Sequence, residues 1–173
     1  MHVPQILIRP LNENDPVYFS VEECAQGWHS TPAKLEKRLQ DERDGRCASF
    51  VAEWNGEAAG YVFLYFAPQS GAFANQGIPE IVDFGVLEKF RRRGIGTKLM
   101  DAAEKAAAER CSRVYLGVGL HSGYGSAQRM YVKRGYIPDG SGVWFRDQVC
   151  EPYTACENDD DLVLYLSKEL RHD

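Results

Sequence analysis

The amino-acid sequence predicts an α/β fold in which strands and helices are intermixed along a chain of 173 residues. Two apolar runs, Cys47 to Trp54 and Glu57 to Ala67, are joined by Asn55-Gly56, the strongest short-range signal for a tight β-hairpin. From Gly94 onward, the apolar residues recur at the spacing of a helix. The hydrophobic content is 44%, and no long linker or internal repeat divides the sequence, so a single domain spanning residues 1–173 is expected.

The amino-terminal part is predicted to contain one strand and two helices. The β-branched residues from Gln5 to Arg9 favour a strand, and the turn-forming residues 12–16 end it. Helical turns are expected from there to about Trp28. The capping residues Ser30-Thr31 precede a second helix, which begins with a proline suited to the first turn and extends from Pro32 to about Gly45.

The part that follows the hairpin is predicted to alternate between strands and helices. A loop at residues 68–77 leads to an apolar strand from Glu80 to Leu87. The next helix places Ile95, Leu99 and Ala106 on one face, opposite a charged face. The remaining predicted elements are a strand at Arg113–Leu120, a short helix at Ser126–Arg134, and closing strands at Val143–Phe145 and Leu162–Leu166.

The composition argues against several classes of protein. The formal net charge of −5 is opposite to the basic face of nucleic-acid-binding proteins, so no nucleic-acid partner is expected. The longest strongly apolar run, Ala58 to Ala67, is too short to cross a bilayer, and the amino terminus lacks the pattern of a secretory signal. The five cysteines are odd in number and scattered without a CxxC pair, and the four histidines are dispersed. These features predict a cytoplasmic protein with reduced thiols, no membrane partner and no metal.

The segment from Glu80 to Lys105 carries the clearest functional signal. Its strand runs directly into Arg91, Arg92, Arg93 and Gly94, where a helix begins. A helix start leaves backbone N–H groups without partners and carries a partial positive charge. Glycines at this point let a ligand approach those donors, and the arginines add permanent charge. The segment is therefore suited to binding a diphosphate.

Other phosphate-binding motifs do not fit this segment. No GxxxxGK[ST] motif precedes the helix, and GxGxxG is absent because Leu99 follows Lys98. One alternative remains open on this segment alone: an exposed basic turn in which Gly94 and Gly96 only mark the start of the helix.

A second segment, SAQRMYVKRGYIPDG, strengthens the functional interpretation. Ala127 and Tyr131 lie four residues apart on one face of a short helix, and Gly135-Tyr136 ends it. In this order, the two segments resemble the GNAT superfamily of acyl-CoA-dependent N-acetyltransferases. The second is similar to the family's A-x-x-L-Y-x-K-x-G-F segment, with Met130 in place of Leu and Tyr136 in place of Phe.

The first segment matches the family's acetyl-CoA loop, R/Q-x-x-G-x-G/A, at Arg91, Gly94 and Gly96. The resemblance implies a mixed, mostly antiparallel central sheet of about six to seven strands flanked by helices, with acetyl-CoA as cosubstrate. Many members carry an asparagine three residues before the motif alanine; Tyr124 stands there in this sequence, so Ser126 or a backbone group is expected to take its place. The implied cofactor-binding residues are Gly85, Val86, Leu87, Arg91, Arg92, Arg93, Gly94, Ile95, Gly96, Thr97, Lys98 and Ser126.

The resemblance also implies direct attack of a primary amine on the acetyl thioester. A backbone N–H near a bulge in the strand, with Val86 the preferred donor, would stabilise charge on the thioester oxygen. Tyr131 is the candidate general acid for the leaving thiolate, and its alternative role is packing. Glu80 is the first candidate for the general base and Asp83 the second; strand alternation places them on opposite faces, and each is alternatively a solvated carboxylate or a structural partner for an arginine.

The expected partner is a small-molecule or peptide amine, with homodimer formation left open. In this family, the early helices and the late loop shape the acceptor site. Aromatic and histidine residues of these segments are Tyr18, Phe19, Trp28, His29, Trp144, Phe145 and Tyr153. Two alternatives remain: a non-catalytic acyl-CoA-binding or sensory domain with the same fold, and an interaction module whose arginine loop binds another anionic partner.

Overall fold

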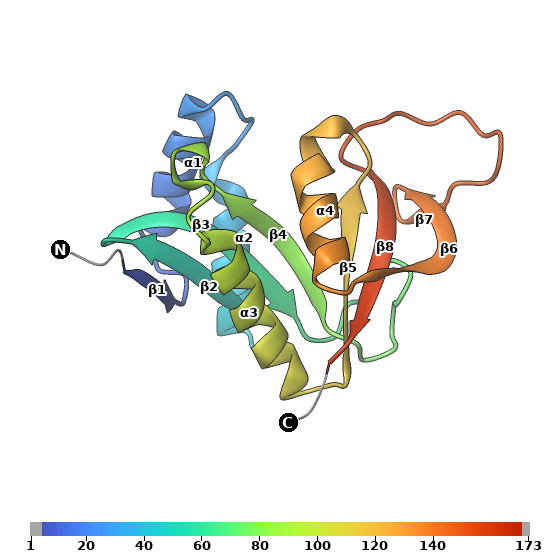
Figure 1. The fold of residues 1–173 in the computed structure, drawn as a ribbon, viewed down its shortest axis with the longest axis horizontal. Coiled ribbons are helices and arrows are strands. Elements are labelled where there is room, and N and C mark those ends of the chain that lie inside the picture. The colour runs from blue at the N-terminus through green and yellow to red at the C-terminus, as the bar shows by residue number, and fades with distance from the viewer. Residues whose placement is uncertain (1–4, 171–173) are drawn as a thin grey trace. The chain divides into compact units, whose positions relative to one another are not determined.

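A computed structural model describes residues 5–170 of the chain (Figure 1). Within these residues, eight strands are hydrogen bonded in the order β1-β2-β3-β4-β5-β8-β6-β7. The pairing of β4 with β5 is parallel, whereas β1 with β2, β2 with β3, and β8 with both β5 and β6 are antiparallel. The predicted α/β class with a mostly antiparallel sheet is confirmed, with eight strands instead of six to seven.

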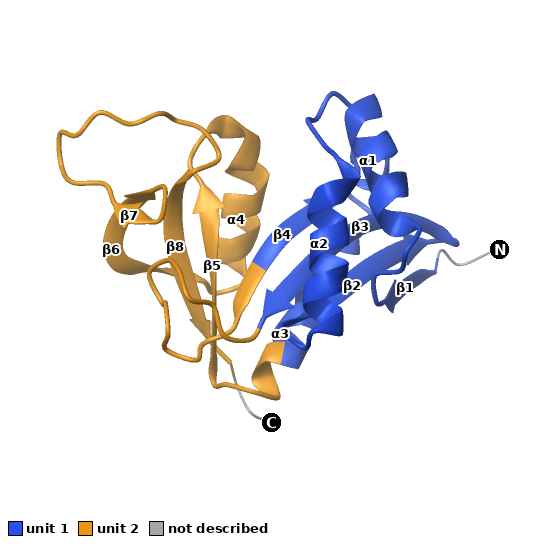
Figure 2. Cartoon of the chain, turned by 180° about the vertical axis from the view of Figure 1, so that it is seen from behind, with its two compact units in different colours: residues 1–65, 82–106 blue, residues 66–81, 107–173 orange. Residues whose placement is uncertain are grey.

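The contacts divide the chain into two compact units (Figure 2), whereas a single domain over residues 1–173 stays a prediction. The first unit comprises residues 5–65 and 82–106. Its elements are β1 (Ile6–Arg9), α1 (Asp15–Ala25), α2 (Pro32–Arg43), β2 (Cys47–Trp54), β3 (Glu57–Tyr65), all but the first two residues of β4 (Glu80–Val86), the short 3-10 helix η1 (Glu88–Phe90) and α3 (Ile95–Ala108) as far as Ala106.

The second unit comprises residues 66–81 and 107–170. It begins β4 with Glu80 and Ile81, which pair with Tyr115 and Leu116 of β5. Its other elements are β5 (Arg113–Gly119), the 3-10 helix η2 (Ser122–Tyr124), α4 (Gly125–Lys133), β6 (Ile137–Phe145), β7 (Gln148–Val149) and β8 (Leu162–Glu169).

The predicted hairpin of the first unit is confirmed. Strands β2 and β3 pair from Cys47 opposite Tyr65 to Trp54 opposite Glu57. Asn55 and Gly56 both have positive φ, 51° and 88°, which suits a two-residue hairpin turn. In this unit α1 and α2 cover one face of the sheet and α3 covers the other (Figures 1 and 2).

Both faces of β3 are buried, which explains its nearly continuous apolar sequence. Val62, Phe63 and Leu64 are fully inaccessible to solvent. On the side of α1, the ring of Phe19 packs edge-on against Tyr61, with 4.8 Å between the ring centroids. On α3, the spacing of its apolar residues produces a buried face that contains Ile95, Leu99, Met100 and Ala103.

Strand β4 is distorted within the first unit. Asp83 has φ of 53°, a left-handed conformation that is uncommon for a residue other than glycine. Beyond it, the chain lies close against β3: the N–H of Leu87 donates to the carbonyl of Ala59 at 2.9 Å. A Cβ placed on Gly60 would lie 2.5 Å from the carbonyl oxygen of Gly85 and 3.1 Å from the Cα of Val86. Only glycine at position 60 permits this approach.

In the second unit, α4 lies along β5 and β8 (Figure 1). The sequence prediction missed much of β6. The structure begins β6 at Ile137, whereas the predicted strand covered only Val143–Phe145. Its register against β8 shifts between Pro138 and Val143, where Gly140 and Gly142 both have positive φ. Proline and glycine are typical of bulges and edge positions, so this composition hides the strand from a propensity argument.

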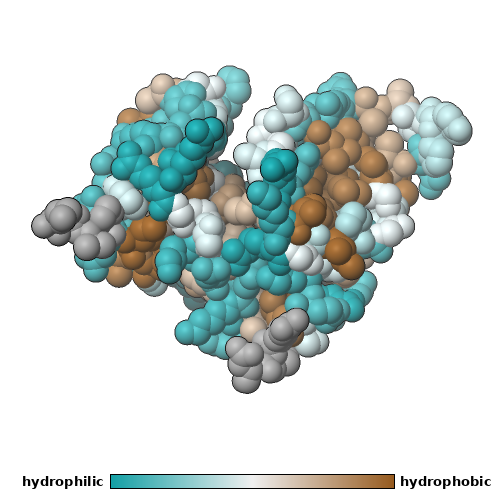
Figure 3. Space-filling view, viewed as in Figure 1, coloured by the Kyte–Doolittle hydropathy of each residue, from teal (hydrophilic) through white to brown (hydrophobic). Residues whose placement is uncertain are grey.

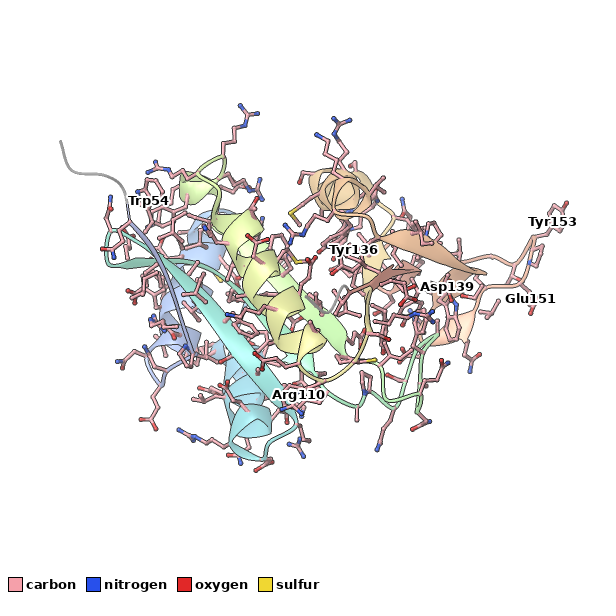
Figure 4. All side chains as sticks on the ribbon, turned by 60° about the horizontal axis from the view of Figure 1, so that its bottom comes forward. Trp54, Arg110, Tyr136, Asp139, Glu151 and Tyr153 are labelled. Atoms are coloured by element: carbon pink, nitrogen blue, oxygen red, sulfur yellow. The ribbon has the colours of Figure 1, made fainter. Side chains whose placement is uncertain are left out.

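The second unit also carries its own aromatic cluster. Phe73, Tyr115 and Tyr165 are buried together, with Trp144 packed edge-on against Tyr165. Apolar atoms also reach the surface over β6 and β8 (Figure 3). The segment between β7 and β8 extends away from the strands, with Tyr153 fully exposed (Figure 4).

The close approach at Gly60 leads to a stability prediction. Gly60→Ala is expected to lower the free energy of unfolding by about 1–3 kcal/mol, because the added methyl collides with backbone atoms that have no rotamer to change. Chemical denaturation measures the effect.

Gly125→Ala is the matched control for this substitution. Gly125 has an ordinary φ of −57° at the start of α4, and its Cβ would meet no atom within 4 Å. Its stability should stay the same or rise. If both variants were equally stable, the close approach of β4 to Gly60 would be contradicted.

Candidate functional site

The end of β4 and the start of α3 lie in one continuous stretch of the first unit. Phe90 anchors η1 in the core, and its N–H donates to the carbonyl of Leu87 at 2.9 Å. After the arginine run, the N–H of Lys98 donates to the carbonyl of Gly94 at 3.1 Å, which begins the helical ladder of α3. The amides of residues 95–97 therefore precede the ladder, as the first amides of any α-helix do.

The loop before α3 has the backbone of an anion-binding turn. Arg92 has φ of 61° and Gly94 has φ of 79°, so two left-handed residues lie close to the helix start. Turns that contain left-handed residues direct successive N–H groups into a concavity. A Cβ on Gly94 would meet no atom within 4 Å. Glycine adopts this φ without strain, and the surface in front of it is open to a ligand.

The three arginines of this loop are exposed at the surface. The guanidinium of Arg91 lies 5.8 Å from the ring of Trp28 and 3.6 Å from Glu88. That of Arg93 lies 5.1 Å from the ring of Trp54, at the end of β2 (Figure 4). These contacts orient two of the cations without burying them. The loop thus combines permanent positive charge with helix-start amides, a donor set that fits a diphosphate.

The orientation of the β4 backbone distinguishes Val86 from Leu87. The N–H of Leu87 donates to Ala59 of β3. Successive N–H groups of an extended chain point to opposite sides, so the N–H of Val86 points away from β3. This orientation supports Val86 as the preferred donor for a thioester oxygen.

Asp83, the second candidate base, forms an ion pair in this structure. Its carboxylate accepts a hydrogen bond from Nε of Arg38 on α2 at 2.6 Å. The Arg38 guanidinium also donates to the hydroxyl of Tyr65 at 2.6 Å and lies 4.9 Å from the centre of its ring. The sequence left open that Asp83 is a structural partner for an arginine, and the structure identifies that arginine.

A buried polar cluster lies on the α1 side of Gly85. The hydroxyls of Tyr61 and Ser30 both donate to the carboxylate of Glu23, each at 2.5 Å. A Cβ on Gly85 would lie 3.7 Å from the Tyr61 hydroxyl. Burial, together with the negative charge of Glu23, raises the pKa of Tyr61 well above its ordinary value, so this phenol keeps its proton.

Sequence reasoning missed these residues because their partners are distant along the chain. Tyr61 reads as one apolar position within a buried strand, and Arg38 as one charge on a charged helix. Ser30 was predicted to cap α2, but its hydroxyl binds Glu23, and Thr31, at the N-cap position, makes no side-chain capping hydrogen bond. No spacing rule in the sequence connects such residues.

Glu80, the first candidate base, lies beside the aromatic cluster of the second unit. It is half-buried, and its carboxylate accepts a hydrogen bond from the Tyr115 hydroxyl at 3.2 Å. Burial, followed by the negative charge of Glu80, raises the pKa of Tyr165 to about 12. The carboxylate thus lies in a partly desolvated aromatic environment, of the kind in which general bases occur.

Tyr131, the candidate acid, is a buried residue of α4. Its ring packs edge-on against Tyr136 at 5.9 Å, and its carbonyl accepts from the Tyr136 N–H, which closes the helix beside Gly135. Burial, with a smaller contribution from Tyr124, raises the pKa of Tyr131, so its proton is available for donation at neutral pH. Ser126 is an exposed residue of the first turn of the same helix.

Tyr124, at the position where many family members have asparagine, has a structural role. Its hydroxyl donates to Asp160 at 2.9 Å, and His121 binds the same carboxylate oxygen. These two hydrogen bonds, His121 first, lower the pKa of Asp160. A Cβ on Gly119 would collide with the Tyr124 ring, so a glycine is needed below it. Tyr124 therefore fixes the start of α4 to the segment before β8.

The structure distributes the predicted residues between the two units. Asp83 and all the predicted cofactor-binding residues from Gly85 to Lys98 lie in the first unit; Glu80, Ser126 and Tyr131 lie in the second. Within residues 5–170, no group of three or more His, Cys, Asp or Glu side chains is arranged to hold a metal. None of the helices in the same range has the length and apolar character needed to span a membrane.

Known proteins share both the sequence pattern and the fold. Residues 14–136 match the model of the Acetyltransferase (GNAT) family. The N-alpha-acetyltransferase of Sulfurisphaera tokodaii is 33% identical over 135 residues, which cover 73% of this chain and 67% of that protein.

Two solved structures show the same fold at lower identity. Ard1 from Thermoplasma volcanium has a TM-score of 0.69 and 19% identity, covering 96% of this chain and 99% of that chain. The ribosomal-protein-S18-alanine N-acetyltransferase from Escherichia coli has a TM-score of 0.66 and 12% identity, covering 98% and 96% of the two chains. The match over residues 14–136 and the relative at 33% identity show that the chain belongs to the GNAT family of acetyltransferases.

Proposed function

We propose that this protein transfers the acetyl group of acetyl-CoA to a primary amine, and that the acceptor is the α-amine of a peptide. The observation that carries the proposal is the loop from Arg91 to Lys98, where left-handed residues, exposed arginines and helix-start amides occur together. The relative at 33% identity is named an N-alpha-acetyltransferase, which favours a peptide amine over a small molecule.

In this proposal, the loop holds the cofactor diphosphate. The amides of Ile95, Gly96 and Thr97 donate to phosphate oxygens, and the positive end of the α3 dipole adds to the attraction. Positive charge near the same anion comes from the exposed side chains of Arg91, Arg92, Arg93 and Lys98. When bound, acetyl-CoA supplies an activated thioester for direct attack by the amine.

The end of β4 serves the reacting carbonyl. The N–H of Val86 donates to the thioester oxygen as negative charge develops there, and Gly85 gives the pantetheine arm close access to the strand. Leu87 fixes this segment through its hydrogen bond to Ala59. A donor that is fixed before the reaction stabilises the transition state without a cost of reorganisation.

Two side chains of the second unit are proposed to move protons. Glu80 accepts the proton of the attacking amine, directly or through water, and Asp83 is the alternative base. Tyr131 donates its hydroxyl proton to the departing thiolate. Its buried position, which raises its pKa, keeps the phenol protonated until the thiolate forms.

The early helices offer a candidate region for acceptor recognition. The segment between α1 and α2 borders a pocket of 410 Å³ whose lining includes Trp28, His29 and Lys34. Aromatic and cationic side chains suit a peptide that presents polar and acidic groups next to its α-amine.

The cytoplasmic location and the absence of nucleic-acid and membrane partners stay predictions. Homodimer formation also stays open.

The proposal predicts diphosphate-dependent binding of acetyl-CoA. Calorimetric titration should give saturable binding of acetyl-CoA, and much weaker binding of S-acetylpantetheine, which lacks the diphosphate. Gly94→Glu should reduce acetyl-CoA affinity about tenfold or more, because it places negative charge and a strained side chain at the anion site.

Gly77→Glu is the control for charge and strain in that experiment. Gly77 is a loop glycine with φ of 68° whose Cβ would also meet no atom within 4 Å. Its acetyl-CoA affinity should match that of the wild type. Absence of acetyl-CoA binding at millimolar concentration would overturn the proposed function and favour an interaction module with another anionic partner.

A second prediction concerns the role of Tyr131. With a peptide acceptor, Tyr131→Phe should lower kcat about a hundredfold while the Kd for acetyl-CoA stays within a factor of about two. The wild-type kcat should show no descending limb up to pH 10, because the raised pKa of Tyr131 keeps its acid form present over that range. The values of kcat are measured from the release of the coenzyme A thiol.

The outcomes of that assay also separate an enzyme from a binder. Unchanged kcat in Tyr131→Phe would limit Tyr131 to packing. Tight acetyl-CoA binding without thiol release, across a panel of peptides with different first residues and polyamines, would favour the non-catalytic acyl-CoA-binding domain instead.

A further inference from the structure

The ion pair between Arg38 and Asp83 acts at the distorted point of β4. Asp83 keeps a left-handed φ of 53° in the middle of a strand. For a residue other than glycine, such a conformation costs on the order of 1–3 kcal/mol and persists only when the surroundings hold it in place. The nearest restraint is the 2.6 Å hydrogen bond from Nε of Arg38 to the Asp83 carboxylate.

A second carboxylate, that of Asp41 on α2, holds Arg38 in place through the hydroxyl of Tyr65. The Arg38 guanidinium donates to the Tyr65 hydroxyl, which in turn donates to Asp41. Asp41 is almost fully buried and also binds Lys37 and Arg46. Burial alone would raise the pKa of Asp41, but these hydrogen bonds outweigh it and lower the pKa to about 2. At neutral pH Asp41 is therefore ionised, and it holds the Tyr65 hydroxyl against the Arg38 guanidinium.

The ion pair between Arg38 and Asp83 lies close along the chain to Val86, the proposed donor to the thioester carbonyl. Asp83 precedes Val86 by three residues within β4, and the segment from Gly85 to Leu87 is fixed on its other side by Gly60 and Ala59 of β3. A change of φ at Asp83 would reorient the peptides between Asp83 and the point where Leu87 is hydrogen bonded to Ala59. The side chain that binds the Asp83 carboxylate comes from α2, a helix with no residue in the predicted cofactor site.

We infer that Arg38 is a positioning residue for catalysis, which holds Asp83 in the left-handed conformation and thereby aims the Val86 N–H at the acyl oxygen. This inference rests on the proposed function, because it assigns a purpose to a donor in that site. Arg38 acts through Asp83 and touches no substrate. Asp83 then serves as a structural anion instead of a base.

The test compares two ligands that differ at the acyl oxygen. Acetyl-CoA has the thioester carbonyl, whereas S-ethyl-CoA is a thioether without it. In the wild type, acetyl-CoA should bind about three- to tenfold more tightly, the range expected for one hydrogen bond. In Arg38→Met, this ratio should fall toward one while the Kd for S-ethyl-CoA stays within about twofold.

A double variant separates backbone positioning from general stabilisation. Glycine adopts positive φ without strain, so Arg38→Met combined with Asp83→Gly should recover most of the wild-type ratio. Arg43→Met is the matched control on the same helix, since Arg43 forms an ion pair with the exposed Glu13. Its ratio should equal that of the wild type. Backbone chemical shifts of Asp83 in ligand-free Arg38→Met should show loss of the left-handed conformation.

Three results would overturn the inference. Arg38→Met with the wild-type ratio would remove the positioning role, as would Asp83 shifts unchanged by the substitution. Equal loss of affinity for both ligands, with a lower melting temperature, would show that the pair only stabilises the fold. Failure of the wild type to bind either ligand would instead overturn the proposed function itself.

Discussion

The left-handed residue in β4 is the constraint on which the end of this strand and its close approach to β3 depend. A strand with regular φ throughout would keep the same direction to its end, whereas Asp83 redirects the chain after Val82. The redirected segment reaches β3 at Gly60, where no side chain larger than a hydrogen atom fits. The orientation of the Val86 N–H therefore depends on the path of β4 and on its contact with β3.

The loop proposed to bind the cofactor, Arg91 to Lys98, depends on the same segment. Leu87 is hydrogen bonded to β3 and begins the short turn through Phe90, whose buried ring fixes the point at which the arginine run leaves the core. Buried Ile95 then fixes the start of α3, so the arginine loop is anchored at both ends by apolar burial. The groups proposed to bind the diphosphate therefore lie on a support that is fixed at both ends, the condition under which charge and dipoles are most effective in binding.

The sequence was sufficient for the parts of the fold and site that depend on local pattern. Asn55-Gly56 predicted the hairpin because a two-residue turn needs positive φ at both positions, and both residues have it. The helical spacing after Gly94 predicted α3 because its buried face is contained in one short stretch. The first part of β6 was missed because Pro138 and Gly140 read as loop residues. The partners of Asp83 and Tyr61 could not be predicted. No local sequence pattern indicates which residue an arginine or glutamate on a distant helix will contact.

The most direct measurement of the central claim is an amide titration by NMR, with the protein labelled and coenzyme A compared with acetyl-CoA. Free coenzyme A should shift the amides of Ile95, Gly96 and Thr97, because they receive the diphosphate, and should leave Val86 nearly unchanged. Acetyl-CoA should shift the same three amides and also move the Val86 amide downfield, because only this ligand brings an acyl oxygen to that N–H. Saturating acetyl-CoA that leaves all four amides in place, or shifts Val86 no more than coenzyme A does, would contradict the account.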